Sequence, residues 1–578
     1  TDTYNVSGGS SNPWRERDNH TNLSPTIQLQ LNYAHSFGKH NIGGTVVAER
    51  IKRRELASWV HAVPTTNDLP LIYFSTMDTY NDTDSTTARL GYIGRFTYNY
   101  DSKYYLEVSA RRDASWKFAP NKRWGTFPAM QAGWRISEEK FFQHLVGGKR
   151  TLSELKLRGS YGKLGDDAIP LTAYDYLSGY NYNSSTVILD GKSVIGSSYK
   201  GVPIDNISWY VSKTTDIGAD YGFWDNRISG AVDFFRRKRT GLLGTKYDIL
   251  VPSELGYTLP FENVKSDQVA GGEFSINYRG EYKKVRFSVG ANFSYARAKT
   301  LKSYKPVFLN SWDHYRNSGE TRFSNTFWGY NVIGQFQSQE EINNYKVNVD
   351  GAGNKTLLPG DLIYKDWNGD GVINDLDQRP IGWGTGKNPI MNGGINFTVA
   401  YSNFDFRADF SAGTGYSFNR KWEMRIPYTN QGNLLAEFYN DRWHREDPYN
   451  VNSKWIPGKY PALRFNNGGH SNYNVDSDFW LTNVHYIRAR TLELGYTIPK
   501  HILAKAKIER FRAYINAYNL FSIDNLRKTG IDAEVSDDNG LTYPQSKYVN
   551  IGFDPLIQQL DEKISVNHIS SPCVCVWL

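Results

Sequence analysis

Cysteine is almost absent from this chain of 578 residues, because its only two, Cys573 and Cys575, lie among the last six residues. This excludes disulfides and thiolate metal sites from nearly the whole chain. Long apolar runs are also lacking. No 18 consecutive residues are apolar, which excludes a transmembrane helix. The opening segment, residues 1–9, is polar and unlike a signal peptide, so we expect a mature, cut or partial chain.

Catalytic and nucleotide-binding motifs are missing as well. The eleven histidines form no His-x-x-x-His pair, and no Gly-x-Ser-x-Gly elbow occurs. Residues 382–388, GWGTGKN, lack the first glycine and the Ser or Thr of a phosphate loop. The net charge of +8 comes from interleaved signs without a basic run, which gives no indication of nucleic-acid binding. We therefore expect neither an enzyme nor a nucleic-acid-binding protein.

Aromatic residues, in contrast, make up 15% of the chain, and many stand in stretches with a period of two. In residues 285–296, VRFSVGANFSYA, apolar and polar or small side chains alternate over twelve positions. The apolar row includes Val285, Phe287, Val289, Phe293 and Tyr295. Residues 404–412 and 510–518 repeat the pattern, and their second faces carry acids and arginines. Such a face would make a poor dry core and indicates a wet lumen.

About fifteen such strands are predicted, and their connections alternate in length. The strands lie near 23–36, 40–55, 86–100, 103–115, 124–137, 153–164, 208–222, 226–239, 266–281, 284–300, 389–402, 404–418, 480–498, 508–520 and 546–553. Tight links at 37–39, 101–103, 225–227, 282–284 and 402–403 alternate with long loops at 57–85, 165–207, 240–265, 301–388 and 419–479. This layout is typical of an all-β protein that forms a transmembrane antiparallel β-barrel with long extracellular loops. A β-sandwich is the alternative, although its strands are rarely so long or so charged inside.

Fifteen strands do not close a barrel of the bacterial type, which has an even strand number. The very large barrels with a plugged lumen have about 22 strands. Either the strand count is off by one or strands are missing, and on the 22-strand model we expect seven further strands and a plug before Thr1. In this arrangement the strands near 23–36 and 546–553 are the two open edges.

Four segments resemble one family closely. They are YYLEVSARRDASWKFAPNKRWGTFPAMQAGWRISEEKFF (104–142), LKLRGSYGKLGDD (155–167), FWLTNVHYIRARTLELGYTIP (479–499) and INAYNLFSIDN (515–525). They are similar, in the same order, to segments of the SusC/RagA-like TonB-dependent transporters, and the similarity reaches about Phe553. The family's plug and TonB-contacting box match nothing here. We therefore assign residues 1–553 to the C-terminal part of the barrel and 554–578 to a tail outside the family.

The resemblance implies a 22-strand barrel in the outer membrane of a Gram-negative bacterium. It also implies energy from the TonB complex, contacted through the missing N-terminal region, and a SusD-like surface lipoprotein as a lid. The implied activity is import of glycans or oligopeptides. The alternative, from another class, is a calcium-stabilised surface glycan-binding or adhesin β-protein.

An ion-binding pattern lies in the longest loop, within residues 361–382, DLIYKDWNGDGVINDLDQRPIG. Oxygen ligands recur at the spacing of a calcium loop, with Gly371 at the sharp turn. The expected ligands are Asp366, Asn368, Asp370, the Val372 carbonyl, Asn374 and Asp377. Flanking helices are not evident, and the alternative is a polar turn without an ion. The sequence predicts a structural Ca²⁺ that holds a long extracellular loop in shape.

Aromatic residues in the loops are candidate platforms for a sugar or peptide ligand. The ones we single out are Trp116, Tyr174, Tyr182, Trp328, Trp422 and Trp443. Packing against a lid or between loops is an alternative role, and so is a place in the aromatic girdle of a barrel.

Overall fold

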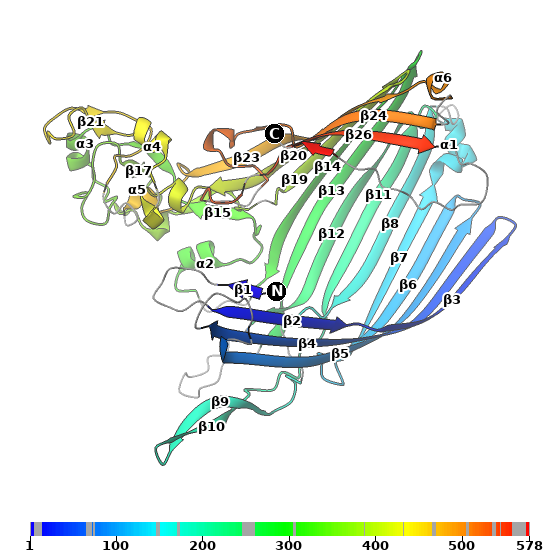
Figure 1. The fold of residues 1–578 in the computed structure, drawn as a ribbon, viewed down its shortest axis with the longest axis horizontal. Coiled ribbons are helices and arrows are strands. Elements are labelled where there is room, and N and C mark those ends of the chain that lie inside the picture. Colours follow the sequence, from blue (N-terminus) through cyan, green and yellow to red (C-terminus); the bar gives the residue numbers. More distant parts are fainter. Residues whose placement is uncertain are drawn as a thin grey trace.

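One broad, curved antiparallel sheet makes up most of the computed structural model, and a separate body of loops stands off one end of it (Figure 1). The structure describes residues 2–4, 14–64, 72, 75–145, 151–169, 174–244, 261–303, 308–386, 388–431, 433–464, 470–504, 508–534, 539–543, 545–557 and 574–576. The strands of the large sheet are β1 (Asp2–Tyr4), β2 (Arg15–Leu23), β3 (Thr26–Phe37), β4 (His40–Pro64), β5 (Ser75–Tyr100), β6 (Tyr104–Ser115), β7 (Trp124–Arg135), β8 (Leu152–Asp166), β11 (Tyr210–Phe223), β12 (Ile228–Gly244), β13 (Glu262–Tyr282), β14 (Val285–Lys302), β19 (Met391–Tyr401), β20 (Phe404–Asn419), β23 (Leu481–Thr497), β24 (Ile508–Tyr518), β25 (Ser522–Asp524), β26 (Tyr548–Ile557) and β27 (Val574–Val576).

Shorter elements lie in the connections. The small two-stranded sheets pair β9 (Tyr180–Leu189) with β10 (Lys192–Tyr199), β15 (Thr326–Gly329) with β18 (Arg379–Trp383), β16 (Val332–Gln335) with β17 (Leu362–Tyr364) and β21 (His444–Arg445) with β22 (Trp455–Ile456). The α-helices are α1 (Lys140–Leu145), α2 (Ser311–Asn317), α3 (Gln339–Asn344), α4 (Ala436–Asn440), α5 (Ser471–Asn474) and α6 (Lys500–Leu503). None of these described helices has the length and apolar character needed to cross a membrane.

The large sheet consists of fifteen long strands, as the sequence predicted. Strands β2 and β3 lie end to end along β4 in one continuous register. Pro25 separates them, because its carbonyl accepts a hydrogen bond from the Lys52 amide but proline has no N–H to donate to β4. Strands β24 and β25 likewise follow each other along β23. The remaining extra strands, β1 and β27, are three-residue segments at the two edges.

The register places apolar side chains on one face of the sheet from β3 to β26. On β14, Val289 stands opposite Tyr278 on one side and Phe397 on the other, and Phe293 stands opposite Phe274. The predicted row of Val285, Phe287, Val289, Phe293 and Tyr295 lies on this face, which we call the apolar face. Large apolar side chains on it are widely exposed: Leu29 on β3 is 76% exposed and Phe234 on β12 is 66% exposed. A surface of this kind is stable only against lipid.

The opposite, polar face carries ion pairs that cross from strand to strand. Arg95 on β5 forms two hydrogen bonds to Glu107 on β6, of 2.8 and 2.7 Å. Arg158 on β8 lies 2.9 Å from both Asp220 on β11 and Asp233 on β12. These charges therefore have opposite partners one or two strands away, and the face remains polar enough to line water. The charged second face that the sequence predicted is confirmed, and a wet lumen stays a prediction.

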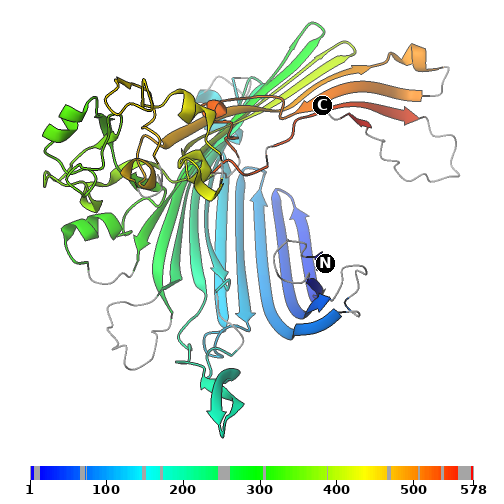
Figure 2. The same ribbon diagram turned by 60° about the vertical axis from the view of Figure 1, so that its left-hand side comes forward.

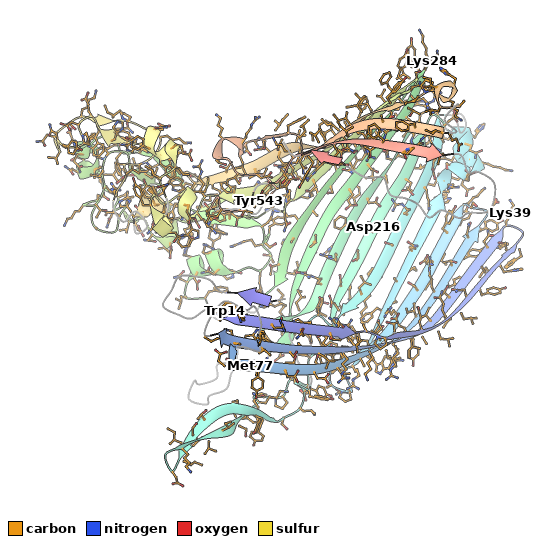
Figure 3. The ribbon with its side chains drawn as sticks, in the orientation of Figure 1. Trp14, Lys39, Met77, Asp216, Lys284 and Tyr543 are labelled. Carbon is orange, nitrogen blue, oxygen red and sulfur yellow. The ribbon has the colours of Figure 1, made fainter. Side chains whose placement is uncertain are left out.

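The connections alternate in length between the two ends of the sheet. Two-residue and three-residue turns at 38–39, 101–103, 283–284 and 402–403 lie at one end, which we call the short-turn end. Figure 3 labels Lys39 and Lys284 at that end, Met77 toward the opposite, long-loop end, and Asp216 in the middle of the sheet. Asp101 and Ser102 both have positive φ, of 51° and 54°, as a tight hairpin turn requires.

Two of the predicted long loops are shorter than expected. The prediction of a loop at 57–85 was wrong, because β4 and β5 are 25 and 26 residues long and pair as far as Pro64 and Ser75. The loop at 240–265 is shortened in the same way by β12 and β13. Polar residues such as those of NDTDST (81–86) concealed the strand, because this part of β5 does not alternate with apolar side chains.

The two edges of the sheet do not meet. Among the described residues, β3 pairs only with β4, and β26 pairs only with β24 and the short β27. The two views of the ribbon show an open, curved wall whose edge strands lie apart (Figure 2). Strand β26 runs four residues beyond Phe553 to Ile557, so the wall extends past the predicted boundary. Most of the predicted tail, 554–578, lies outside the described residues.

We expect an arginine on the apolar face to be far more costly than one on the polar face. In a complete, membrane-inserted barrel, Val289→Arg should lower the free energy of unfolding by roughly 2–4 kcal/mol, because the charge is moved into the hydrocarbon region. The matched change Asn292→Arg, on the polar face of the same strand, should have little effect. Urea unfolding in lipid measures both, and equal losses would contradict the assignment of the faces.

Candidate functional site

Two long connections pack together into one body at the long-loop end, which we call the loop body (Figure 1). It consists of residues 308–386 and 420–480. One hydrophobic core forms mainly within the first segment, and Val475 and Phe479 of the second segment pack against it. A second core groups Phe438, Tyr460, Tyr473 and Trp480 in the second segment. The loop body is therefore a folded unit mounted on β14, β19, β20 and β23.

A buried polar cluster ties the two segments of the loop body together. Asp361, which is fully buried, accepts hydrogen bonds from Arg464 (2.5 Å) and from the Asn472 side chain (2.7 Å). The Asn472 side chain in turn accepts a hydrogen bond from the Leu362 amide. These bonds span more than 100 residues of sequence. They also satisfy the carboxylate in a place where an unpaired charge would be costly.

His470 completes this cluster. Its Nε2 lies 2.9 Å from Nη1 of Arg464 and 3.9 Å from Oδ2 of Asp361. Burial lowers the pKa of His470, and the neighbouring Arg464 lowers it further, whereas Asp361 acts in the opposite direction. The ring Nδ1 also accepts from the Asn472 amide at the start of α5, so the geometry suits a neutral imidazole.

The predicted calcium loop is a compact turn that is held by its own side chains. Asp366 accepts hydrogen bonds from the amides of Gly369 (2.7 Å) and Gly371 (2.9 Å). Both glycines have positive φ, of 74° and 80°, which permits the sharp reversal of the chain. Asp377 is fully buried and accepts from the amides of Trp367 and Asn374.

The other predicted ligands belong to the same turn. Asn368 accepts from the Asp370 amide, and Asp370 accepts from the Val372 amide. This last bond lowers the pKa of Asp370, which keeps the carboxylate ionised. The side chain of Asn374 accepts from the Leu376 amide and caps the short 3₁₀ helix Asp375–Asp377. The described residues contain no group of three or more His, Cys, Asp or Glu placed to hold a metal.

A second polar turn packs against this loop. Asp350 accepts hydrogen bonds from the amides of Ala352, Asn354 and Thr356. The backbone of Asn348 bonds to Gly371 and Ile373 on the calcium loop, at 2.8 and 2.9 Å. The two turns therefore brace each other, and the loop is ordered by hydrogen bonds of the protein.

Two of the predicted aromatic residues line the same cavity. Trp116, between β6 and β7, and Tyr174, between β8 and β9, border a space of about 690 Å³ at the long-loop end. The other side chains that line it include Arg50, Arg89, Trp124 and Tyr176. Tyr174 is 63% exposed, with φ of 64°. The cavity combines flat rings with guanidinium groups.

The structure does not bring the remaining four aromatic residues to this cavity. Tyr182 is exposed on the β9–β10 hairpin, and Trp422 is half-exposed at the edge of the loop body. Trp328 packs within the loop body, where the guanidinium groups of Arg316 and Arg322 lie 4.7 and 5.1 Å from its ring. Ligand contact by these residues stays a prediction.

Trp443 is a core residue of the loop body. It is only 3% exposed, and the backbone of Gly360 approaches its ring so closely that a Cβ there would lie 2.2 Å from Cγ. Its indole N–H is buried and has no hydrogen-bond partner in the described part of the chain. In this conformation the ring is not presented to a ligand.

The cluster of Asp361, Arg464, His470 and Asn472 was not found from the sequence. Its members lie in two separate loops, and none of them belongs to a recognisable motif. The only local signal is that Asp361 precedes an apolar triplet, Leu362–Tyr364, that is buried as β17. Sequence spacing cannot show which distant polar residue completes such a cluster.

The comparisons with known proteins agree with this architecture. The family described as "TonB dependent receptor-like, beta-barrel" matches residues 1–337, which is more than half of the chain. The chain belongs to this family of TonB-dependent receptor β-barrels. Its wall is thus part of an outer-membrane protein of a Gram-negative bacterium.

Among curated proteins, the chain is similar to the TonB-dependent receptor SusC of Bacteroides thetaiotaomicron, with 25% identity over 80% of this chain and 43% of SusC. It is also similar to the TonB-dependent receptor P39 of Formosa agariphila, with 28% identity over 96% of this chain and 54% of the relative. The chain thus spans about half the length of the curated relatives it matches. Among solved structures, the RagAB peptide importer in its open-open state superposes with a TM-score of 0.71 at 20% identity, covering 94% of this chain and 55% of that one. This last likeness supports the fold.

The position of His470 predicts a pH-dependent loop body. Because burial lowers its pKa, the stability that the neutral ring provides is present above the pKa of the unfolded chain, about 6.5. It is lost as the pH falls through that value toward the folded-state pKa. We expect proteolysis within residues 308–480 to accelerate between pH 7 and pH 5, about the range over which histidine titrates.

The variant His470→Gln is the control for this prediction. It keeps a hydrogen-bond acceptor beside Arg464 and the Asn472 amide but cannot titrate. Its proteolysis rate should therefore be nearly independent of pH over the same range. If the variant and the wild type accelerate equally, the pH dependence comes from another group.

Proposed function

We propose that this chain is the C-terminal part of the barrel of an outer-membrane importer. The observation that supports this proposal best is the division of the sheet into two faces. One face is apolar across all fifteen long strands, and the other is crossed by ion pairs such as those of Arg158. A wall of this kind separates lipid from a water-filled lumen. An adhesin requires a binding surface, but its function does not require a water-filled lumen.

Glycans or oligopeptides are the substrates that we propose. SusC and P39 are named as TonB-dependent receptors, which supports coupling of import to the TonB complex. RagAB is a peptide importer, but its likeness to this chain concerns the fold. The exposed aromatic residues at the long-loop end suit sugar rings and peptide side chains equally.

A SusD-like surface lipoprotein is the partner that we propose for the long-loop end. The loop body provides a folded platform for such a lid, because it has its own hydrophobic cores and a buried polar cluster. Contact with the TonB complex belongs, in this proposal, to a plug region of the complete protein.

Import can be tested with cells that express the complete protein and its lid. Labelled oligosaccharides and labelled oligopeptides should be compared for accumulation inside the outer membrane. We expect one of these two classes to accumulate, and accumulation should be lost in cells without TonB. Ligand that stays on the surface with or without TonB would instead indicate an adhesin or glycan-binding protein.

We also propose a structural Ca²⁺ in the turn of Asp366–Asp377. The turn offers carboxylate, amide and carbonyl oxygens at the spacing of a calcium loop, and Gly369 and Gly371 give it the necessary shape. Asp370 is exposed, so its carboxylate is accessible to an ion from solvent. The ion would add to an arrangement that internal hydrogen bonds already hold.

Calcium should protect this turn from proteolysis. In the wild type, we expect about 1 mM calcium to slow cleavage within residues 361–382 relative to a chelator, since extracellular calcium modules bind in this range. Asp370→Ala should remove the difference, because Asp370 is an expected ligand whose side chain bonds, among the described residues, only within the turn. The control Asp375→Asn changes an acid outside the ligand set and should keep the difference. Equal cleavage of the wild type in calcium and chelator would contradict the site.

A further inference from the structure

A row of basic side chains crosses the apolar face of the sheet near the long-loop end. Lys213 on β11 stands directly opposite Lys163 on β8 and Lys238 on β12. Lys238 is followed in the same row by Gln268 and then by Lys299 on β14. Arg236 lies two residues from Lys238 on the same face. We call Lys163, Lys213, Arg236, Lys238 and Lys299 the basic strip.

The strip lies where the apolar surface ends. Along β11 and β12, the pair Ile217–Phe234 is followed by Thr215–Arg236 and then by Lys213–Lys238. Ile217 and Phe234 are 64% and 66% exposed and belong to the lipid-facing surface. Lys213 is roughly 13 Å further along the strand, at about 3.3 Å per residue. The charges thus follow the exposed apolar pair toward the long-loop end.

No carboxylate neutralises these lysines in the described part of the chain. None of the five basic side chains forms an ion pair, and Arg236 donates only to the neutral Gln268, at 2.7 Å. Lys213, Arg236 and Lys238 are exposed. Like charges directly opposite each other on a sheet are destabilising, so this arrangement is costly unless anions lie between them.

The two ends of the apolar face differ in their content of basic side chains. At the short-turn end the same face carries stacked aromatic rings, with Tyr104 6.2 Å from Tyr100 and 6.5 Å from Trp134. Along the ladders from β3 to β20, the described residues of this face near the short turns include no lysine or arginine. At the long-loop end the aromatic pair Tyr92–Trp124 is instead accompanied by Arg112, 5.2 Å from the Trp124 ring. On these ladders, the lysines and arginines of the apolar face therefore lie at the long-loop end.

We propose that the basic strip binds the phosphate groups of anionic lipids in the leaflet that surrounds the long-loop end of the barrel. Lysine and arginine at a membrane interface extend their charged ends toward headgroups while their stems cover apolar surface. Phosphate oxygens between Lys163, Lys213 and Lys238 would turn three repelling charges into charge-assisted hydrogen bonds. The short-turn end of the apolar face carries aromatic rings and does not require anionic headgroups. The strip thus fixes both the depth of the wall and the kind of leaflet it accepts.

The experiment uses the protein with its complete barrel in nanodiscs of phosphatidylglycerol or of phosphatidylcholine. The variant Lys213→Ala/Lys238→Ala removes two charges of the strip. Its matched control, Lys283→Ala/Lys284→Ala, removes two charges at the short-turn end, and Lys213→Arg/Lys238→Arg keeps the charge. The readouts are the melting temperature and the number of anionic lipids retained in mixed nanodiscs.

We expect the effect of the alanine variant to depend on the lipid. In phosphatidylglycerol it should melt below the wild type, because bound phosphate is lost. In phosphatidylcholine it should melt at the same temperature or higher, because repulsion between lysines is removed. Retention of anionic lipid should fall on the order of tenfold, and the arginine variant and the control should retain it.

Three results would overturn the proposal. The first is that the alanine variant and the short-turn control behave alike in both lipids. The second is that inorganic phosphate in detergent stabilises the wild type as strongly as phosphatidylglycerol does, which would indicate a site for soluble anions. The third is that the alanine variant loses the co-purified lid lipoprotein while its lipid retention is unchanged, which would make the strip a protein contact.

Discussion

Hydrogen bonding of the backbone is the constraint on which the rest of this structure depends. In hydrocarbon no water can satisfy an N–H or C=O group, so each strand must bond to a neighbour on both sides. The fifteen long strands meet this requirement with each other over most of their length. Because side chains in a strand alternate, the same ladder sorts apolar residues to lipid and charged residues to the lumen. The alternation over residues 285–296 therefore reflects one strand face that contacts lipid and one that contacts the lumen.

The loops are subject to the opposite condition, since they stand in water and must supply their own order. The loop body does so with two hydrophobic cores and with buried polar residues centred on Asp361. The turn of Asp366–Asp377 is held by hydrogen bonds from backbone amides to its side chains, and the Asn348 backbone bonds to it from a second turn. A rigid loop body can present surfaces to a ligand and a lid without refolding. The basic strip lies on β8, β11, β12 and β14 toward the same long-loop end of the sheet.

Most of the wall could be predicted from the sequence, because period-two patterning reflects a repeated physical environment. The prediction failed where that environment changes. The outer part of β5, before Thr86, carries polar residues on both faces, so the hairpin of β4 and β5 was predicted as a loop. The loop body was not predicted because its contacts join residues about 100 positions apart, such as Asp361 and Arg464. Of the aromatic candidates, only Trp116 and Tyr174 share a cavity, since spacing along the chain does not reveal which loops meet.

The two edge strands of the described sheet have backbone groups that still require hydrogen-bond partners. Strand β3 exposes Ile27, Leu29 and Leu31 to lipid, yet beyond β4 no strand of the described residues bonds to its other edge. Strand β26 has only the three-residue β27 beside it. Unpaired backbone groups cannot be left in hydrocarbon, so the barrel needs further strands between these two edges. The basic strip is set well inside the wall, on β8, β11, β12 and β14, where both neighbours of each strand are present. Its arrangement is therefore a property of the described strands themselves and does not depend on how the barrel closes.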